Sequence, residues 1–207
     1  VNLVIELDAR MAVPPWSQGT LKTMEGQFVA GEDRFEQLFS TEGHVSIDGT
    51  DMPFSGGGLR IHRKGGNRSD YSDWRGHCWQ SAKLPSGRAF GYINYAPRPD
   101  GSVRYCEGFV FDGGQVHAAR VVDAPWMTTM MPSGQDVSFA LEYAGRRAEI
   151  KGETIMSTFS LGGFMSNLQQ GTARYTWDGE AANGMIERSY PSPAIKLSHG
   201  PSVPAVA

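Results

Sequence analysis

The segment from residue 54 to residue 80, FSGGGLRIHRKGGNRSDYSDWRGHCWQ, concentrates side chains that could perform acid–base chemistry. Near its C-terminal end, Asp73 precedes His77 by a few residues, and a second histidine, His62, lies upstream. A carboxylate beside an imidazole can act as a general acid or a general base, because imidazole exchanges a proton near neutral pH. The alternative for either histidine is a structural role, in which the ring bonds a backbone carbonyl.

Two glutamates outside this segment are further candidate acids. Glu187 lies in an alternating stretch, so its side chain faces away from those of Ile186 and Arg188. If Ile186 faces a dry core, Glu187 is exposed and without a catalytic role; if the interior is wet, Glu187 is a candidate acid. Glu107 presents the same two alternatives. The candidate catalytic residues are therefore His77, Asp73, His62 and Glu187.

Arginine and tryptophan are also concentrated in and near this segment. A guanidinium group can clamp a carboxylate or an enolate oxygen, and an indole face can stabilise a cation or line a pocket. The candidate ligand-binding residues are Arg60, Arg63, Arg68, Trp74, Trp79 and Trp126. For the arginines we favour a structural alternative, because a buried guanidinium must be paired; the acids available are Asp70, Asp73 and Asp178. For the tryptophans, the alternative is core packing. Trp126 follows a strand in a proline-containing turn, which favours a place at a barrel rim.

The sequence predicts neither a metal nor a cofactor. Four of the five histidines lack a recognisable ligand spacing; they are His44, His62, His77 and His117. Phosphate-loop, dinucleotide-binding, HExxH and GxSxG motifs do not occur. The glycine run from residue 56 to residue 58 has no helix signal after it, so it is weak support for phosphate binding.

The composition is that of a globular protein with no global attraction to polyanions. Of 207 residues, 40% are hydrophobic, and 19 basic against 22 acidic residues give a net charge of -3. This balance argues against nucleic acid or an anionic membrane as a partner. The longest apolar runs fall short of the ~20 residues that a membrane-spanning helix needs. We therefore expect no nucleic acid partner and no membrane span, and a cytoplasmic location.

The two cysteines and the two ends of the chain add three expectations. Cys78 and Cys106 are expected to be buried free thiols, since a disulfide would require neighbouring strands that the sequence alone does not place. The first residues alternate like a strand and lack an initiator methionine. We therefore expect a missing N-terminal portion, with a homo-oligomer as another possibility. The last residues, 193–207, are expected to form a flexible tail.

Glycine and proline divide most of the chain into short strand-like segments. Turn signals such as Asp48-Gly49, Gly113-Gly114, Ala144-Gly145 and Asp178-Gly179 separate about ten strands, which predicts an antiparallel meander. Only residues 31–40 and 163–170 approach a helical period, for one or two turns. A meander of this length avoids bare edges by closing, and about eight strands enclose one small ligand. The expected fold is an all-β, antiparallel, lipocalin-like barrel or calyx.

Three stretches carry a resemblance to a known family. They are GGGLRIHRKGGNRSDYSDWRGHCWQSAKLPSGRAFGY, EGFVFDGG with ARVVDAPW, and RYTWDGEAANGMIERS. The chain resembles, over about residues 1 to 190, a bacterial family distantly related to the hydroxyneurosporene synthase (carotenoid 1,2-hydratase) and AttH-like group. The resemblance implies two consecutive lipocalin-like barrels. Residues 1–53 would be closing strands of the first barrel, and residues 54–192 the second.

The resemblance and the candidate residues together give the functional hypotheses. The related hydratases imply addition of water to an isolated carbon–carbon double bond. Such a step needs a proton donor, a controlled water and a carbocation stabilised by aromatic faces. The first hypothesis is a hydratase, dehydratase or isomerase that acts on a lipophilic isoprenoid, steroid or aromatic without a cofactor. The alternatives are a lipocalin-like binder of a hydrophobic ligand, and a structural role for this portion of the protein.

Overall fold

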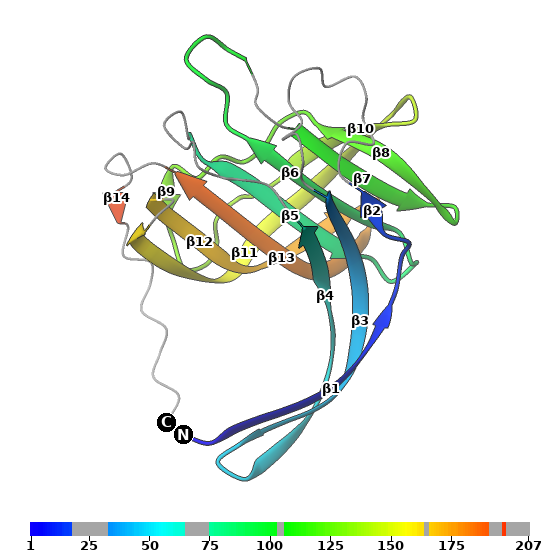
Figure 1. Cartoon of the computed structure of the whole chain (residues 1–207), viewed down its shortest axis with the longest axis vertical. Helices are drawn as coiled ribbons and strands as arrows, with labels where there is room; N and C mark the ends of the chain where they lie inside the picture. Colours follow the sequence, from blue (N-terminus) through cyan, green and yellow to red (C-terminus); the bar gives the residue numbers. More distant parts are fainter. Residues whose placement is uncertain (18–32, 65–74, 103–105, 164–165, 191–195, 198–207) are drawn as a thin grey trace.

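The computed structural model describes residues 1–17, 33–64, 75–102, 106–163, 166–190 and 196–197. Every regular element in these ranges is a β-strand (Figure 1). The strands are β1 (Leu3–Met11), β2 (Trp16–Ser17), β3 (Asp33–Ile47), β4 (Thr50–Lys64), β5 (His77–Lys83), β6 (Ala89–Tyr95), β7 (Cys106–Asp112), β8 (Gln115–Val121), β9 (Thr129–Met130), β10 (Phe139–Tyr143), β11 (Arg146–Gly163), β12 (Ser166–Trp177), β13 (Glu180–Tyr190) and β14 (Lys196–Leu197). In this part of the chain there is no helix that is long and apolar enough to cross a membrane.

Eight of these strands form a closed antiparallel barrel in the order β10-β11-β12-β13-β5-β6-β7-β8. Most neighbours in the ring are also consecutive strands of the chain. The two exceptions are the pair β8 and β10 and the pair β13 and β5, which close the ring. The expected up-and-down, lipocalin-like barrel is therefore confirmed. The turn signals act as predicted: at Asp178-Gly179, for example, both residues have positive φ, 49° and 82°, as a tight hairpin turn requires.

The two windows with the nearest approach to a helical period are strands. Residues 33–40 belong to β3, and residues 166–170 belong to β12. In β3 the strand pattern is hidden because the buried positions include Arg34 and Glu36 beside Leu38. Polar side chains at buried positions remove the apolar alternation by which strands are recognised.

Side chains fill the barrel interior. Phe139 lies within 4.8 to 6.2 Å, centroid to centroid, of three other rings, those of Phe90, Tyr92 and Tyr175. At one end the guanidinium of Arg188, which is 1% exposed, donates hydrogen bonds to Gln169, Gln135 and the Pro125 carbonyl. The interior is thus a packed core with one polar end.

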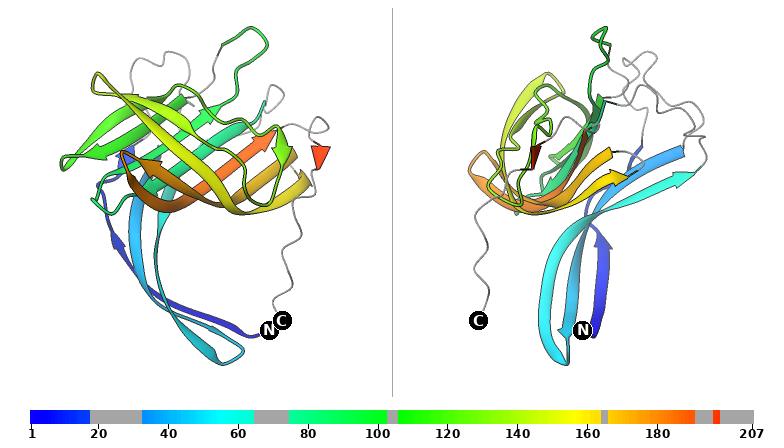
Figure 2. Two further views of the ribbon diagram at one scale, coloured as in Figure 1. Left: turned by 180° about the vertical axis from the view of Figure 1, so that it is seen from behind. Right: turned by 90° about the vertical axis from the view of Figure 1, so that its left-hand side faces the viewer.

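The remaining long strands form a second sheet that rests on the barrel at one end only. β3 is central, with β4 along one edge and β1 and β2 along the other. Figures 1 and 2 show these strands continuing away from the barrel as a curved arm. The arm exposes large apolar side chains; they are Leu3, Val4, Ile5, Leu7, Met11, Ile47, Met52 and Phe54. An exposed apolar surface of this kind is typical of a protein contact. That a further segment of the protein or a second copy of the chain covers it stays a prediction.

The packed interior predicts a large effect of removing its central ring. Phe139→Ala should lower the free energy of unfolding by about 3–5 kcal/mol, because a buried cavity replaces the contacts of the ring. Ile155→Ala, on a side chain that is 46% exposed, should change it by about 0.5 kcal/mol or less. Denaturant unfolding of both variants measures the difference. Similar values for the two would contradict a close-packed interior.

Both cysteines are buried free thiols, as expected from the sequence. Burial raises the pKa of Cys106 to about 11 and also raises that of Cys78. Because only the thiolate attacks a disulfide reagent, neither cysteine should react with an aromatic disulfide at neutral pH until the protein unfolds. The absorbance of the released thiolate reports the reaction, and prompt labelling of the folded protein would contradict the burial.

Candidate active site at the junction of sheet and barrel

The end of the sheet that rests on the barrel buries polar side chains against the outer barrel wall. On β3, Arg34, Glu36 and Leu38 occupy alternate positions, and all three are buried. Trp16 pairs with Glu36 across β2 and β3, and its ring stacks on Phe109 of the barrel at 5.7 Å. Apolar contacts therefore hold the two layers together, and charged groups lie between them.

Glu36 is the most deeply buried of these charged groups. Its side chain is 0% exposed; Oε1 accepts a hydrogen bond from Arg34 Nη2 at 2.5 Å, and Oε2 accepts one from Trp79 Nε1 at 3.2 Å. The guanidinium of Arg34 also lies over the Trp79 ring, 5.0 Å from its centroid. Burial raises the pKa of Glu36 above its usual range, although Arg34 and Trp79 act in the opposite direction.

Glu187 faces the same junction from β13 and is held by two donors. Its Oε1 lies 2.9 Å from His77 Nε2, and its Oε2 accepts a hydrogen bond from Gln170 Nε2 at 2.8 Å. Burial alone would raise the pKa of Glu187. The bonds from His77 and Gln170, with the nearby charge of Arg34, outweigh burial and lower it. The side chain keeps 20% of its surface exposed, so a ligand can reach it.

His77 has both ring nitrogens occupied. Nε2 contacts Glu187, and Nδ1 lies 2.6 Å from the hydroxyl oxygen of Ser189. That oxygen also accepts a hydrogen bond from the His77 backbone N–H at 3.2 Å, so Ser189 anchors both the ring and the backbone of His77. His77 therefore orients Glu187 and offers no free nitrogen to a substrate.

Trp79 connects the two glutamates. It stands directly opposite Glu187 in the register of β5 and β13, and its indole N–H donates to Glu36. Directly opposite residues on neighbouring strands share a face, with Cβ atoms about 5 Å apart. The junction thus brings together two carboxyl groups whose pKa values are shifted in opposite directions.

Among the sequence-predicted site residues that the structure describes, three meet at this junction. His77, Glu187 and Trp79 lie there. Arg60 and His62 lie on the exposed side of β4, where both rest on the ring of Phe35. Asp73, Arg68 and Trp74, with Asp70, lie outside the described residues. The remaining two are Arg63, which is opposite Arg34 in the β3–β4 register, and Trp126, which is half-buried against the barrel core.

Among the described residues, Asp178 forms its ion pair with Arg88, at 3.0 Å. One sequence-based interpretation needs correction. Ile186 does face the dry barrel core, yet Glu187 is not simply exposed. The expectation failed because it treated the outer barrel face as solvent, whereas part of that face is covered by the second sheet.

Sequence reasoning missed Arg34, Glu36, Trp16 and Ser189. Arg34 and Glu36 alternate with Phe35 on one strand, which is the pattern of a solvated face. Their burial depends on a contact with strands more than forty residues downstream. The sequence does show one signal of this pair, which is two opposite charges spaced two residues apart in a strand-like stretch. This spacing is common on exposed strands, so it did not indicate burial.

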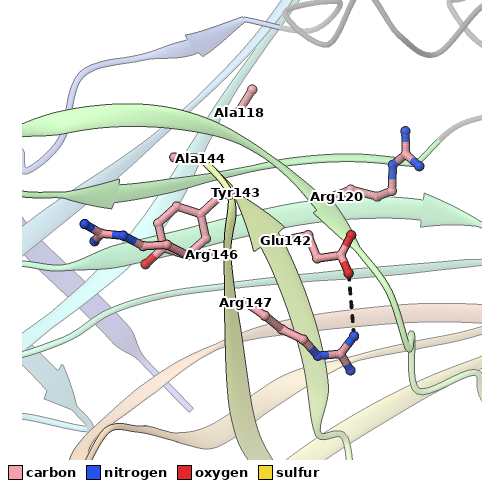
Figure 3. Close-up of a pocket in the computed structure, with 8 residues that line it drawn as sticks. Ala118, Arg120, Glu142, Tyr143, Ala144, Arg146 and Arg147 are labelled. Atoms are coloured by element: carbon pink, nitrogen blue, oxygen red, sulfur yellow. Dashed lines mark ion pairs between the residues drawn. The ribbon is translucent and has the colours of Figure 1, made fainter.

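A hollow elsewhere on the surface lacks the features of the junction. It measures about 480 Å³ beside the turn between β10 and β11 and is lined by Arg120, Glu142 and Arg147, among others (Figure 3). Arg147 there pairs with exposed carboxylates, including that of Glu142 at 3.7 Å. Paired surface charges of this kind carry little energy and suggest no chemistry. Within the described residues, no group of three or more potential metal ligands gathers at any point.

Comparison with known proteins identifies the fold. No family model and no curated protein sequence matches the chain. Among solved structures, a Nitrosomonas europaea protein provisionally identified as AttH superposes with a TM-score of 0.66 at 18% identity. Kievitone hydratase from Nectria haematococca superposes with a TM-score of 0.56 at 14% identity. Each match covers 91% of this chain and 62% of the other. The chain is structurally similar to AttH-type proteins, as the sequence resemblance implied, and it spans less than two thirds of their length.

The opposite pKa shifts predict opposite pH slopes. A lowered pKa gives stability that is present above the ordinary glutamate pKa and is lost as the pH falls through the lowered value. A raised pKa gives stability that is present below the ordinary value and is lost as the pH rises through the raised value. The stability lost in Glu187→Gln should therefore grow with rising pH, and that lost in Glu36→Gln should shrink.

Denaturant unfolding at several pH values from acid to neutral measures both slopes. Glu153→Gln, on an exposed glutamate of β11, serves as the baseline. Slopes of the same sign for the two junction variants would contradict the opposite environments of Glu36 and Glu187.

Proposed function

We propose that the protein is a cofactor-independent hydratase, dehydratase or isomerase that acts by acid–base chemistry on a lipophilic small molecule at this junction. One observation carries the proposal: Glu36 and Glu187 are linked through Trp79, and their environments shift their pKa values in opposite directions. Paired carboxyl groups with separated pKa values are the arrangement by which a site supplies an acid and a base together.

The geometry gives each group a role in this proposal. Glu187 is the base, because it is the more exposed carboxylate and its lowered pKa keeps it ionised. Glu36 is the acid, because burial favours its protonated form. His77, with Ser189 behind it, is a positioning residue that orients Glu187. Neither the contacts nor the exposure of His62 supports a role for it.

The surroundings of Trp79 support a lipophilic ligand. Trp79 and Ile93 form a buried apolar cluster with Leu59, Tyr95 and Met185 packed around it. This cluster lies on the outer wall beside Glu187, so an apolar molecule would contact hydrocarbon while a polar atom approached the carboxylate. The fold shared with kievitone hydratase is compatible with this reaction class, but the fold alone does not define an activity.

The alternative of a ligand held inside the barrel has less support. The aromatic side chains around Phe139 occupy the interior, and Arg188 is already bonded to protein acceptors. A binder that only sequesters a ligand would also have no need for paired carboxyl groups of opposite pKa shift. The observations therefore favour chemistry at the outer wall over storage inside it.

Glu187→Gln tests the proposed base. Terpenoid alcohols, prenylated phenols and their dehydrated forms are incubated with the protein, and mass spectrometry records the gain or loss of one water molecule. The variant should lose about 10²- to 10⁴-fold in rate, as expected for removal of a general base. Glu142→Gln, on an exposed glutamate beside the β10–β11 turn, is the matched control and should keep the wild-type rate.

His77→Gln separates positioning from direct catalysis. The histidine bond lowers the pKa of Glu187, so the acid limb of the pH–rate profile should move to higher pH in this variant, with partial loss of rate. A complete loss of rate with an unmoved limb would assign His77 a direct role. Full turnover by Glu187→Gln would overturn the proposed function.

A further inference from the structure

We propose that the substrate of this site carries a carbonyl oxygen conjugated to the reacting carbon, so that the reaction passes through an enolate and not through a carbocation. This inference rests on the proposed function. It goes further by naming the substrate class as β-hydroxy carbonyl compounds and the corresponding α,β-unsaturated carbonyl compounds. Three features of the junction carry it: two unsatisfied buried donors, their common face, and the position of one positive charge.

The first feature is a pair of buried N–H donors without acceptors. Trp16 is 2% exposed and Arg34 is 7% exposed. Neither the indole N–H of Trp16 nor the Nε–H of Arg34 has a hydrogen-bond partner in the described part of the chain. Both groups can only donate, and burying them unsatisfied costs free energy comparable to a lost hydrogen bond. An acceptor oxygen supplied by a ligand would satisfy them.

The second feature is that both donors flank the proposed acid on one face. Trp16 is directly opposite Glu36 in the β2–β3 register, and Arg34 lies two residues from Glu36 along β3. Directly opposite residues share a face, as do residues two apart on one strand. The donors therefore point to the same side of the sheet as Glu36, which is the side that faces Trp79 and the barrel.

The third feature is the buried guanidinium itself. Protonation of an isolated double bond creates a carbocation, which an aromatic face such as that of Trp79 would stabilise. Here the Arg34 cation already occupies a place over that ring, at 5.0 Å from its centroid. A second positive charge beside it would be repelled, whereas a developing enolate oxygen would be stabilised by the guanidinium and the indole donor.

The corresponding dehydration balances with the residues present. Glu187 accepts the proton from the carbon beside the carbonyl, and the electron pair of that C–H bond passes into the enolate. The enolate then expels the hydroxyl group from the next carbon, forming the double bond, and Glu36 supplies the proton that makes the leaving group water. Hydration is the reverse sequence, and no oxidant or reductant is needed.

The binding test uses two probes of similar shape. Benzylideneacetone has a carbonyl conjugated to its double bond, and β-ethylstyrene has the same phenyl and alkene without the oxygen. Titration of the full chain should show benzylideneacetone binding about tenfold tighter or more, as expected for hydrogen bonds from a charged donor. Its ultraviolet absorption should also move to longer wavelength, because donors at the carbonyl stabilise the excited state.

Two variants identify the donors. Trp16→Phe keeps an aromatic ring but removes the N–H, and Arg34→Gln removes the charge; each should bring the affinity ratio of the two probes close to one. Trp177→Phe, at an equally buried tryptophan in the barrel core, should leave the ratio unchanged. Circular dichroism checks folding, and the absorption shift in the wild-type protein tests the inference even if a variant does not fold.

The turnover test distinguishes this inference from the proposed function. The protein should dehydrate the aldol adduct of acetone and benzaldehyde to benzylideneacetone and should leave α-terpineol, a tertiary alcohol without a carbonyl, unchanged. Turnover of α-terpineol alone, lost in Glu187→Gln, would overturn the enolate inference and keep the proposed function. Equal affinity for the two probes, without an absorption shift, would overturn the inference whatever the turnover. Turnover of either alcohol that is unaffected by Glu187→Gln would overturn the proposed function itself.

Discussion

The hydrogen bond from Trp79 to Glu36 is the contact on which the rest of the junction depends. It joins the second sheet to the barrel wall, and it places the buried Arg34–Glu36 pair against the indole ring. Because Arg34 and Glu36 are both buried, an alignment that moved Trp79 away from Glu36 would leave a buried carboxyl oxygen without its donor. This cost favours the alignment in which Trp79 meets Glu36. That alignment also sets where Glu187 lies relative to Glu36, because Glu187 is the cross-strand neighbour of Trp79.

β13 carries polar groups on both of its faces at this level of the barrel. Glu187 faces the junction, and the next residue, Arg188, faces the interior, where three hydrogen bonds hold it. An alternating strand fixes the direction of each side chain through the positions of its neighbours. The interior network around Arg188 thus restrains the backbone from which Glu187 projects, while His77 and Gln170 restrain its carboxylate from outside. In the proposed reaction, a carboxylate restrained from both sides of the wall would be well oriented for a directed proton transfer.

The barrel could be predicted from the sequence, but only some residues of the candidate site could. Hairpin turns such as Asp178-Gly179 are local, so their chemistry is visible in two residues. The face of Glu187 was also predictable, because alternation next to Ile186 and Arg188 depends only on the strand itself. Glu36 was not predictable, since its burial requires that a distant barrel strand covers it. His77 was found as a candidate base, but its positioning role depends on Ser189, which lies more than a hundred residues away.

The exposure of the two carboxyl groups also sets the direction in which a substrate would lie. Glu187 is reachable from outside, whereas Glu36, with the donors on Arg34 and Trp16, is enclosed. A substrate would therefore present its acidic C–H bond to the outer side of the junction and its oxygen to the inner side. The apolar cluster around Ile93 would hold the hydrocarbon remainder along the barrel wall. An isolated alkene has no atom that could satisfy the inner donors, so its binding would leave their desolvation uncompensated. Under the proposed inference, the charges at the sheet–barrel junction, and not the barrel, would select the intermediate.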